Sequence, residues 1–154
     1  MKVLIITQSS ENGLNRKVAL ECSHIADDFI QDSALETKIM NASDVKSNDL
    51  SEFSHVIMVV PEWNGSFPHT FKAMIDDAGY PSVFKKKKIL LIGTSDSSFG
   101  NIMGISHLEH ILQWVGAFVD SKRICINNIR DNVDEFSVYD HEMRMYKAIR
   151  KFLK

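Results

Sequence analysis

The chain of 154 residues has no large excess of charge of either sign, no long apolar run and no cysteine cluster. Its formal net charge of −2 excludes the global basic field that attracts nucleic acid or anionic lipid. Residues 1–7 form an apolar run that is too short for a membrane span or a signal peptide. Cys22 and Cys125 form no CxxC pair, which disfavours a disulfide framework or a zinc cluster and favours a reducing compartment. We therefore expect a cytoplasmic protein that binds neither nucleic acid nor membrane.

Glycine and proline are scarce, with seven and three residues, which excludes collagen-like and low-complexity chains. Hydrophobic residues make up 44% of the chain and charged residues 25%, as in ordinary globular proteins. A chain of this length can bury a core without disulfides or a structural metal. The length predicts a single domain over residues 1–154.

Short apolar runs alternate with amphipathic segments along the chain. Apolar, β-branched runs suit strands that are buried on both faces of a parallel sheet, and they predict strands at 2–7, 55–60 and 89–93. A weaker strand is predicted at 35–40 and an edge-like strand at 123–126. Apolar residues three or four apart predict helices at about 14–29, 68–78, 100–115 and 135–153, with a polar connection over 41–54. This alternation requires parallel pairing through right-handed crossovers. The sequence therefore predicts a three-layer α/β sandwich around a five-stranded parallel sheet.

Polar loops follow the first, third and fourth predicted strands. In such sheets ligands bind beyond the carboxyl ends of the strands, where the strand order reverses. The loop after the first strand also leads into a helix, whose unpaired N–H groups and dipole favour a phosphate. Its candidate binding residues are Ser9, Ser10, Asn12, Gly13, Leu14 and Asn15. The same loop also suits a plain helix cap, because Ser and Asn are preferred capping types.

Two common nucleotide patterns are missing after the first strand. Neither GxGxxG nor GxxxxGK[ST] occurs there, which disfavours a Rossmann dinucleotide site and a P-loop. A phosphoacceptor receiver domain is rejected, because no acidic pair follows the first strand.

The loop after the third strand carries the most specific pattern. The segment PEWNGSFP at residues 61–68, followed by Lys72 and Asp76, resembles the PEYNGSxPxxxKxxxD pattern of the NADPH-dependent FMN reductase family. Eight positions match at fixed spacing, and Trp63 takes the aromatic position. The resemblance extends more loosely over residues 2–126 and implies a flavodoxin-like fold. It also implies that this loop holds the isoalloxazine ring of FMN, through Pro61, Glu62, Trp63, Asn64 and Gly65.

These residue types suit a flavin. The ring needs backbone donors and acceptors close by, and Gly65 permits a close approach. Trp63 offers apolar area for stacking or an edge contact. Since the flavin carries the redox chemistry, no catalytic side chain is required. The alternative interpretations are a tight loop with a packed Trp63, and a helical ion pair between Lys72 and Asp76.

The other two loops match the family less closely. The resemblance places residues 94–100 on the other side of the flavin ring, with Thr94, Ser95 and Gly100 as candidate ligands, and Asn101 stands where the family usually has a second glycine. In the first loop the family pattern GSxRxxSxN, anchored on Asn15, meets Ser10 in place of its arginine and Gly13 in place of its second serine. The chain therefore lacks the guanidinium fork that would form charge-assisted bonds to a phosphate at that position.

The resemblance implies an FMN-dependent oxidoreductase. NADPH or NADH would deliver hydride to the flavin, and a small acceptor (flavin, quinone, azo compound or metal oxyanion) would then take the electrons in the same cleft. It also implies a homodimer or homotetramer, with Trp114 at the contact. The changes at Ser10 and Gly13 favour an alternative, a non-enzymatic relative that acts as a weak flavin carrier, ligand sensor or interaction module. A one-electron flavodoxin lacks support, because no TxTGxT-like phosphate pattern is present.

Structural roles are predicted for the remaining reactive side chains. His107 and His110 have no partner at ligand spacing, so we expect no metal site. His69 is expected to be an exposed helix residue, or else a substrate contact. Residues 85–88, four lysines, suit a solvated lead-in to a strand, or else attraction of the extra phosphate of NADPH. Four further residues are assigned to the core: Cys22, Cys125, Met143 and Tyr146.

Overall fold

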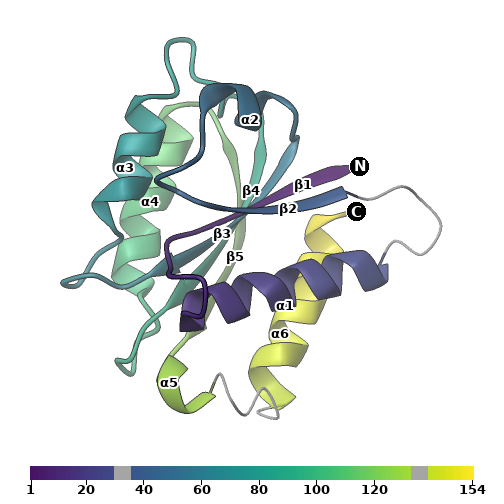
Figure 1. The fold of residues 1–154 in the computed structure, drawn as a ribbon, viewed down its shortest axis with the longest axis vertical. Coiled ribbons are helices and arrows are strands. Elements are labelled where there is room, and N and C mark those ends of the chain that lie inside the picture. The colour runs from purple at the N-terminus through teal and green to yellow at the C-terminus, as the bar shows by residue number, and fades with distance from the viewer. Residues whose placement is uncertain (30–35, 133–138) are drawn as a thin grey trace.

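Five parallel strands form the centre of the fold, in the order β2-β1-β3-β4-β5 (Figure 1). The structure is a computed structural model that describes residues 1–29, 36–132 and 139–154. The strands are β1 (Lys2–Thr7), β2 (Glu36–Asn41), β3 (His55–Pro61), β4 (Lys88–Thr94) and β5 (Phe118–Ile126). The helices are α1 (Leu14–Phe29), α2 (Ser47–Ser51), α3 (His69–Asp76), α4 (Ile102–Trp114), α5 (Ile129–Asn132) and α6 (Tyr139–Phe152). The α/β sandwich predicted from the alternation of strands and helices, and the flavodoxin-like fold implied by the resemblance, are confirmed.

Helices cover both faces of the sheet. α1 and α6 pack on one face, and α2, α3 and α4 pack on the other (Figure 1). Side chains alternate along a strand, so Val3 and Ile5 of β1 join the α1/α6 core, while Leu4 and Ile6 join the opposite core. Burial on both faces explains why β1, β3 and β4 consist of continuous apolar runs.

Some boundaries differ from the prediction. The polar segment 41–54 contains the short helix α2, which buries Leu50. β5 begins at Phe118 instead of residue 123, and its first residues pair with β4 ahead of a register shift between Ile89 and Leu91. Pro68 is the extended residue before α3 and not its first helical residue. Residues 135–138 of the predicted last helix lie outside the described residues.

The prediction that Met143 and Tyr146 face the core is wrong. Their side chains are 38% and 37% exposed, whereas Met145 and Ile149 are completely buried. Apolar residues of α6 fit a three-to-four spacing in more than one register, and packing against α1 selects the register of Met145. The guanidinium of Arg150 lies 5.1 Å from the Tyr146 ring and donates to its hydroxyl at 2.8 Å.

The other core predictions have mixed outcomes. Cys22 is buried as predicted, and burial raises the pKa of its thiol. Cys125 is only half-buried.

The prediction of a fully solvated lysine run is wrong at Lys87, which is 8% exposed and donates from Nζ to the Phe53 carbonyl at 2.6 Å. Its long apolar stem allows this burial, which lowers the pKa of the ammonium group.

A buried histidine lies at the amino end of β3. The ring of His55 packs edge-on against Phe152 of α6 at 5.4 Å, and its Nδ1 lies 2.9 Å from the Ser54 hydroxyl. Its Nε2 is buried and has no hydrogen-bond partner in the part of the chain that the structure describes. Burial first, and then the charges of Lys88 and the N-terminal amino group, lower the pKa of His55.

We expect His55 to make the protein less stable as the pH falls below neutrality. The unfolded chain takes up a proton at His55 near its ordinary pKa of 6.5, while the folded chain resists it, so the unfolded state binds more protons in this window. Urea midpoints at about pH 7.5 and about pH 5.5 should differ less in His55→Gln than in the wild type. His24→Gln, on the exposed face of α1, is the control and should keep the wild-type difference. An unchanged pH dependence in His55→Gln would contradict the expectation.

Candidate functional site

Three polar loops meet at the carboxyl edge of the sheet. We call residues 8–13 the first loop, residues 62–67 the second loop and residues 95–101 the third loop; they follow β1, β3 and β4. These strands are neighbours, and parallel pairing places their carboxyl ends at the same edge. The chain order reverses between β1 and β3, which is where ligands bind in open α/β sheets.

Hydrogen bonds tie the elements beside the loops to one another. The Thr94 hydroxyl at the end of β4 donates to Asn15 Oδ1, in the first turn of α1, at 2.5 Å. The Asn101 side-chain amide donates to the Val60 carbonyl in β3 at 3.0 Å. Two of the predicted ligands, Asn15 and Thr94, therefore hold the start of α1 at the end of β4, beside the first and third loops.

The first loop gathers two hydroxyl groups at the start of α1. A Cβ atom on Gly13 would collide with Ser9 Oγ and would lie 3.0 Å from Ser10 Oγ. The Ser9 hydroxyl thus occupies the space that a serine side chain at residue 13 would need. The Ser9 N–H donates to Asn41 Oδ1 at 3.0 Å, which fixes the loop against the end of β2.

The remaining first-loop candidates differ in what they can offer a ligand. Asn12 is exposed, so its amide is accessible. Leu14 packs partly against the α1/α6 core, and its polar contribution is limited to the backbone N–H of the first helical turn.

Arg16 is a candidate that the sequence analysis missed. It lines a hollow of about 290 Å³ together with Ser9 and Ser10, and the carboxylates of Glu11 and Asp44 line the same hollow. Within residues 1–29, 36–132 and 139–154, no ion pair or side-chain hydrogen bond engages its guanidinium. The sequence feature that could have identified this candidate is an arginine in the first turn of the predicted helix. Its guanidinium can supply a positive charge at a loop where the family arginine is replaced.

The second loop is a tight hairpin. The Trp63 N–H donates to the Ser66 carbonyl at 2.8 Å, and the Ser66 N–H donates to the Trp63 carbonyl at 3.1 Å. Asn64 and Gly65 lie between them with φ of 50° and 78°, as in the two-residue turns that favour Asn-Gly. The turn explains both residues without a ligand. Trp63 is 45% exposed and is therefore not the packed tryptophan of the alternative interpretation.

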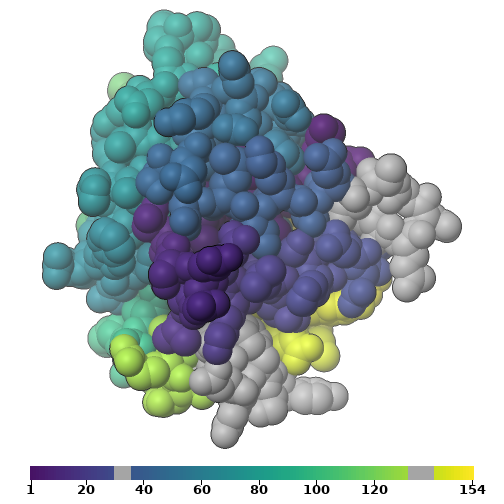
Figure 2. All heavy atoms as spheres, viewed as in Figure 1, coloured from purple at the N-terminus to yellow at the C-terminus, as the bar shows by residue number. Residues whose placement is uncertain are grey.

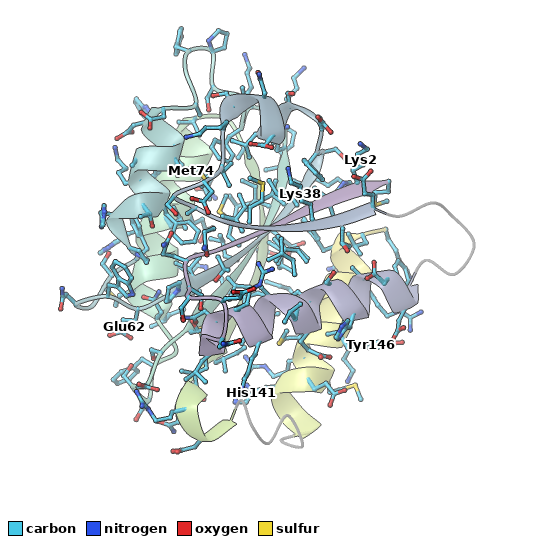
Figure 3. All side chains as sticks on the ribbon, in the orientation of Figure 1. Lys2, Lys38, Glu62, Met74, His141 and Tyr146 are labelled. Atoms are coloured by element: carbon cyan, nitrogen blue, oxygen red, sulfur yellow. The ribbon has the colours of Figure 1, made fainter. Side chains whose placement is uncertain are left out.

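The start of the second loop is joined to β4 and to the third loop. Pro61 is buried at the end of β3 opposite Thr94, and the Glu62 N–H donates to the Thr94 carbonyl at 2.9 Å. The Glu62 carboxylate accepts a hydrogen bond from the Ser97 hydroxyl at 3.0 Å. Figure 3 shows Glu62 at this edge of the molecule, well away from α6.

The third loop is packed against β5. The Ser95 N–H donates to the Ile126 carbonyl at 3.0 Å, and the Ser95 and Ser97 hydroxyls lie 2.8 Å apart. Gly100 has φ of 57°, and a Cβ atom there would lie only 2.7 Å from Cys125 Cβ. Packing against β5 therefore requires a glycine at residue 100, whatever it contacts in a ligand.

Asn101 stands where the resemblance places a second glycine. Its backbone adopts a conformation that is typical of glycine. Its φ of 61° and ψ of 33° are left-handed, a conformation that Asn adopts more readily than other side chains. Its Oδ1 atom packs against Gly104, where a Cβ atom would collide with it. This oxygen is buried and has no hydrogen-bond partner among the described residues.

One hollow borders the second loop, and another lies beyond it. One, of about 360 Å³, lies between the second and third loops, and Glu62, Gly65 and Asn101 line it together with the exposed Phe99 and Met103. The larger one, of about 520 Å³, lies beyond this site, between α3 and the segment before and at the start of α2. The sequence analysis did not predict the larger hollow.

Other predicted features lie outside the three loops. Lys72 and Asp76 form the predicted ion pair on α3, at 2.6 Å. His107 and His110 are exposed on α4. A search of the described residues finds no group of three or more His, Cys, Asp or Glu side chains placed to hold a metal ion. None of the helices that the structure describes is long and apolar enough to cross a membrane.

Comparison with known proteins gives a family match. Residues 1–129 match the family model described as NADPH-dependent FMN reductase. No curated protein matches the sequence significantly.

Solved structures show the same fold at low sequence identity. FerB from Paracoccus denitrificans, described as a flavoenzyme NAD(P)H:(acceptor) oxidoreductase, has a TM-score of 0.75 and 19% identity, over 99% of this chain and 96% of its own. Flavodoxin 1 from Bacillus cereus has a TM-score of 0.75 and 15% identity, over 99% and 97%. An NADH:FMN oxidoreductase named EMOB, in its apo form, has a TM-score of 0.76 and 16% identity, over 98% and 87%. Both reductases and a flavodoxin therefore share this architecture.

Two glycine substitutions should separate crowding from backbone strain. Gly65→Ala keeps a left-handed φ but meets open space, so it should cost about 1–2 kcal/mol of unfolding free energy. Gly100→Ala has the same strain and a collision with β5, and should cost about 1–3 kcal/mol more. Urea denaturation of both variants measures the difference. Equal destabilisation would contradict the packing role of Gly100.

Proposed function

The chain belongs to the NADPH-dependent FMN reductase family, and from this premise we propose that it is an FMN-dependent NAD(P)H oxidoreductase. FMN binds across the three loops, and electrons pass from NADPH or NADH to a small acceptor such as a flavin, quinone, azo compound or metal oxyanion. The observation that carries the proposal is the family-matched second loop, which stands beside two further polar loops at the reversal point of the sheet.

The first loop fits the phosphate end of FMN. Ser9 and Ser10 bring hydroxyl groups to the first turn of α1, where free N–H groups and the helix dipole favour an anion. Thr7, at the end of β1, is completely buried, and its hydroxyl has no partner within the described residues. An unsatisfied buried polar group costs about 1–3 kcal/mol, which a ligand or water at this site would relieve.

The second and third loops fit the ring end. The hollow between them has an unpartnered buried oxygen on Asn101 and exposed apolar surface on Phe99 and Met103. A planar heteroaromatic ring offers both a hydrogen-bonding edge and a large apolar face. Covering this apolar surface with such a ring would be favourable.

Bound FMN would supply the redox chemistry by accepting hydride from the nicotinamide and passing the electrons to the acceptor. The chain's own residues hold and orient the cofactor. The bond between Thr94 and Asn15 holds the start of α1 against the end of β4, between the proposed phosphate and ring ends. The Glu62–Ser97 bond fixes the second loop against the third, and it places a carboxylate beside the ring hollow.

A non-enzymatic flavin carrier is the second candidate. Ser10, in place of the family arginine, favours it, because the loop loses a charge-assisted bond to the phosphate. Arg16, in the first turn of α1, supplies a cation in the same hollow as Ser9 and Ser10 and so weakens this argument.

Anaerobic mixing of the FMN-loaded protein with NADPH and, separately, with NADH tests the proposal. We expect one or both to bleach the oxidised flavin spectrum, and a quinone added afterwards to restore it. A protein that binds FMN but is reduced by neither nucleotide would be the carrier. A protein that binds no flavin would contradict both candidates.

Arg16→Met should weaken FMN binding on the order of tenfold, because it removes one charge-assisted contact to the phosphate. Riboflavin, which has no phosphate, should bind wild type and Arg16→Met equally. Lys17→Met removes a neighbouring exposed cation and controls for net charge. Fluorescence titrations measure the affinities of all three proteins for FMN and for riboflavin. An equal loss of FMN and riboflavin binding in Arg16→Met would contradict a phosphate contact.

A further inference from the structure

A hollow of about 520 Å³ forms a groove beside the proposed flavin site. One wall is α3, and the other is residues 42–48, between the end of β2 and the start of α2. The two segments, teal and blue, lie side by side on the face shown in Figure 2, and Figure 3 labels Met74 on the α3 wall. Nothing in the proposed flavin site uses this groove.

The groove begins next to the second loop and runs along α3. His69, Ala73 and Asp77 line it at intervals of four residues, which corresponds to one face of a helix about 12 Å long. At the near end, the His69 ring lies 6.1 Å from the ring of Trp63. At the far end, the Ser47 hydroxyl donates to the Asp77 carbonyl at 3.2 Å. A ligand in the groove would therefore extend from the second loop to the far end of α3.

Two polar side chains of the groove form no ion pair or hydrogen bond among the described residues, although the charge of Lys46 acts on Asp49 at longer range. Lys46 is exposed, and no carboxylate in the described part of the chain forms an ion pair with its ammonium group. The neighbouring Asp49 carboxylate is bonded to Lys38 Nζ at 2.9 Å and to the Lys46 backbone N–H at 3.0 Å. The Thr70 hydroxyl is buried and also has no hydrogen-bond partner among the described residues. A cation and a free hydroxyl beside an apolar floor suit a phosphate joined to an organic group.

We infer that this groove binds the adenosine diphosphate half of the hydride donor, with Lys46 and Thr70 as ligands of its pyrophosphate. The inference rests on the proposed function, because the nicotinamide half must reach the flavin past Trp63. The groove supplies what the ring hollow lacks: a cation free of ion pairs and a continuous channel along α3. A dinucleotide bound in this way is held by its distal half while its nicotinamide stays at the second loop.

ADP carries no hydride, so its binding tests whether the groove recognises this half of the donor independently of electron transfer. Calorimetry on the FMN-loaded protein should show ADP binding to the wild type, and binding weaker on the order of tenfold in Lys46→Ala and in Thr70→Val. Lys72→Ala is the matched control, since Lys72 is on α3 but is paired with Asp76 and does not line the groove. ADP affinity unchanged in both groove variants, or no ADP binding by the wild type, would overturn the inference.

A truncated donor gives the second arm. Lys46→Ala should raise the concentration of NAD(P)H that half-saturates flavin reduction on the order of tenfold, with little change in the limiting rate. Reduction by reduced nicotinamide mononucleotide, which lacks the adenosine half, should be the same in wild type and variant. Equal effects on both donors would overturn the inference. If the wild type binds ADP but NAD(P)H does not reduce its flavin, the proposed reductase fails while the groove stands.

Discussion

The parallel pairing of β1, β3 and β4 is the constraint on which the site depends. The registers pair Ile6 of β1 with Met58 of β3 and Pro61 of β3 with Thr94 of β4, so the polar loops leave the sheet at the same edge. Because both faces of these strands are covered, their side chains are almost entirely apolar, and hydrogen-bonding groups gather where the strands end. Thr94 stands at this edge, and its hydroxyl holds Asn15 of α1. The position of the candidate site at the strand ends therefore follows from the burial of both faces of the sheet.

Much of the fold could be predicted because burial on both faces leaves a strong pattern in the sequence. Continuous apolar runs marked β1, β3 and β4 to within about two residues, the usual uncertainty in boundaries. Elements with little buried surface left no such pattern: α2 buries mainly Leu50, and the first half of β5 is largely exposed. The face of α6 was missed for another reason. Met143 and Met145 both fit a helical stripe, and only packing against α1 distinguishes them.

The candidate site was predictable where chemistry and spacing coincide in one segment. The second loop is contiguous, and its Asn-Gly pair also specifies the turn that presents Trp63. The groove, and the hollow that Arg16 lines, were missed because each combines residues from separate segments that only the folded chain brings together. Gly100 was singled out for a ligand, but its φ and its closeness to Cys125 give it a packing role as well. A family pattern thus contains both structural and binding requirements.

The most direct test of the account is a backbone-amide NMR titration of the protein with FMN. We expect saturable shifts in the first, second and third loops together, including Ser10, Gly65 and Ser97, with one apparent affinity for all three loops. Residues along the α3 groove beyond His69 should shift little until a pyridine nucleotide is added. Saturable shifts confined to one loop, shifts centred elsewhere, or no shifts at all would contradict a flavin site built from three loops.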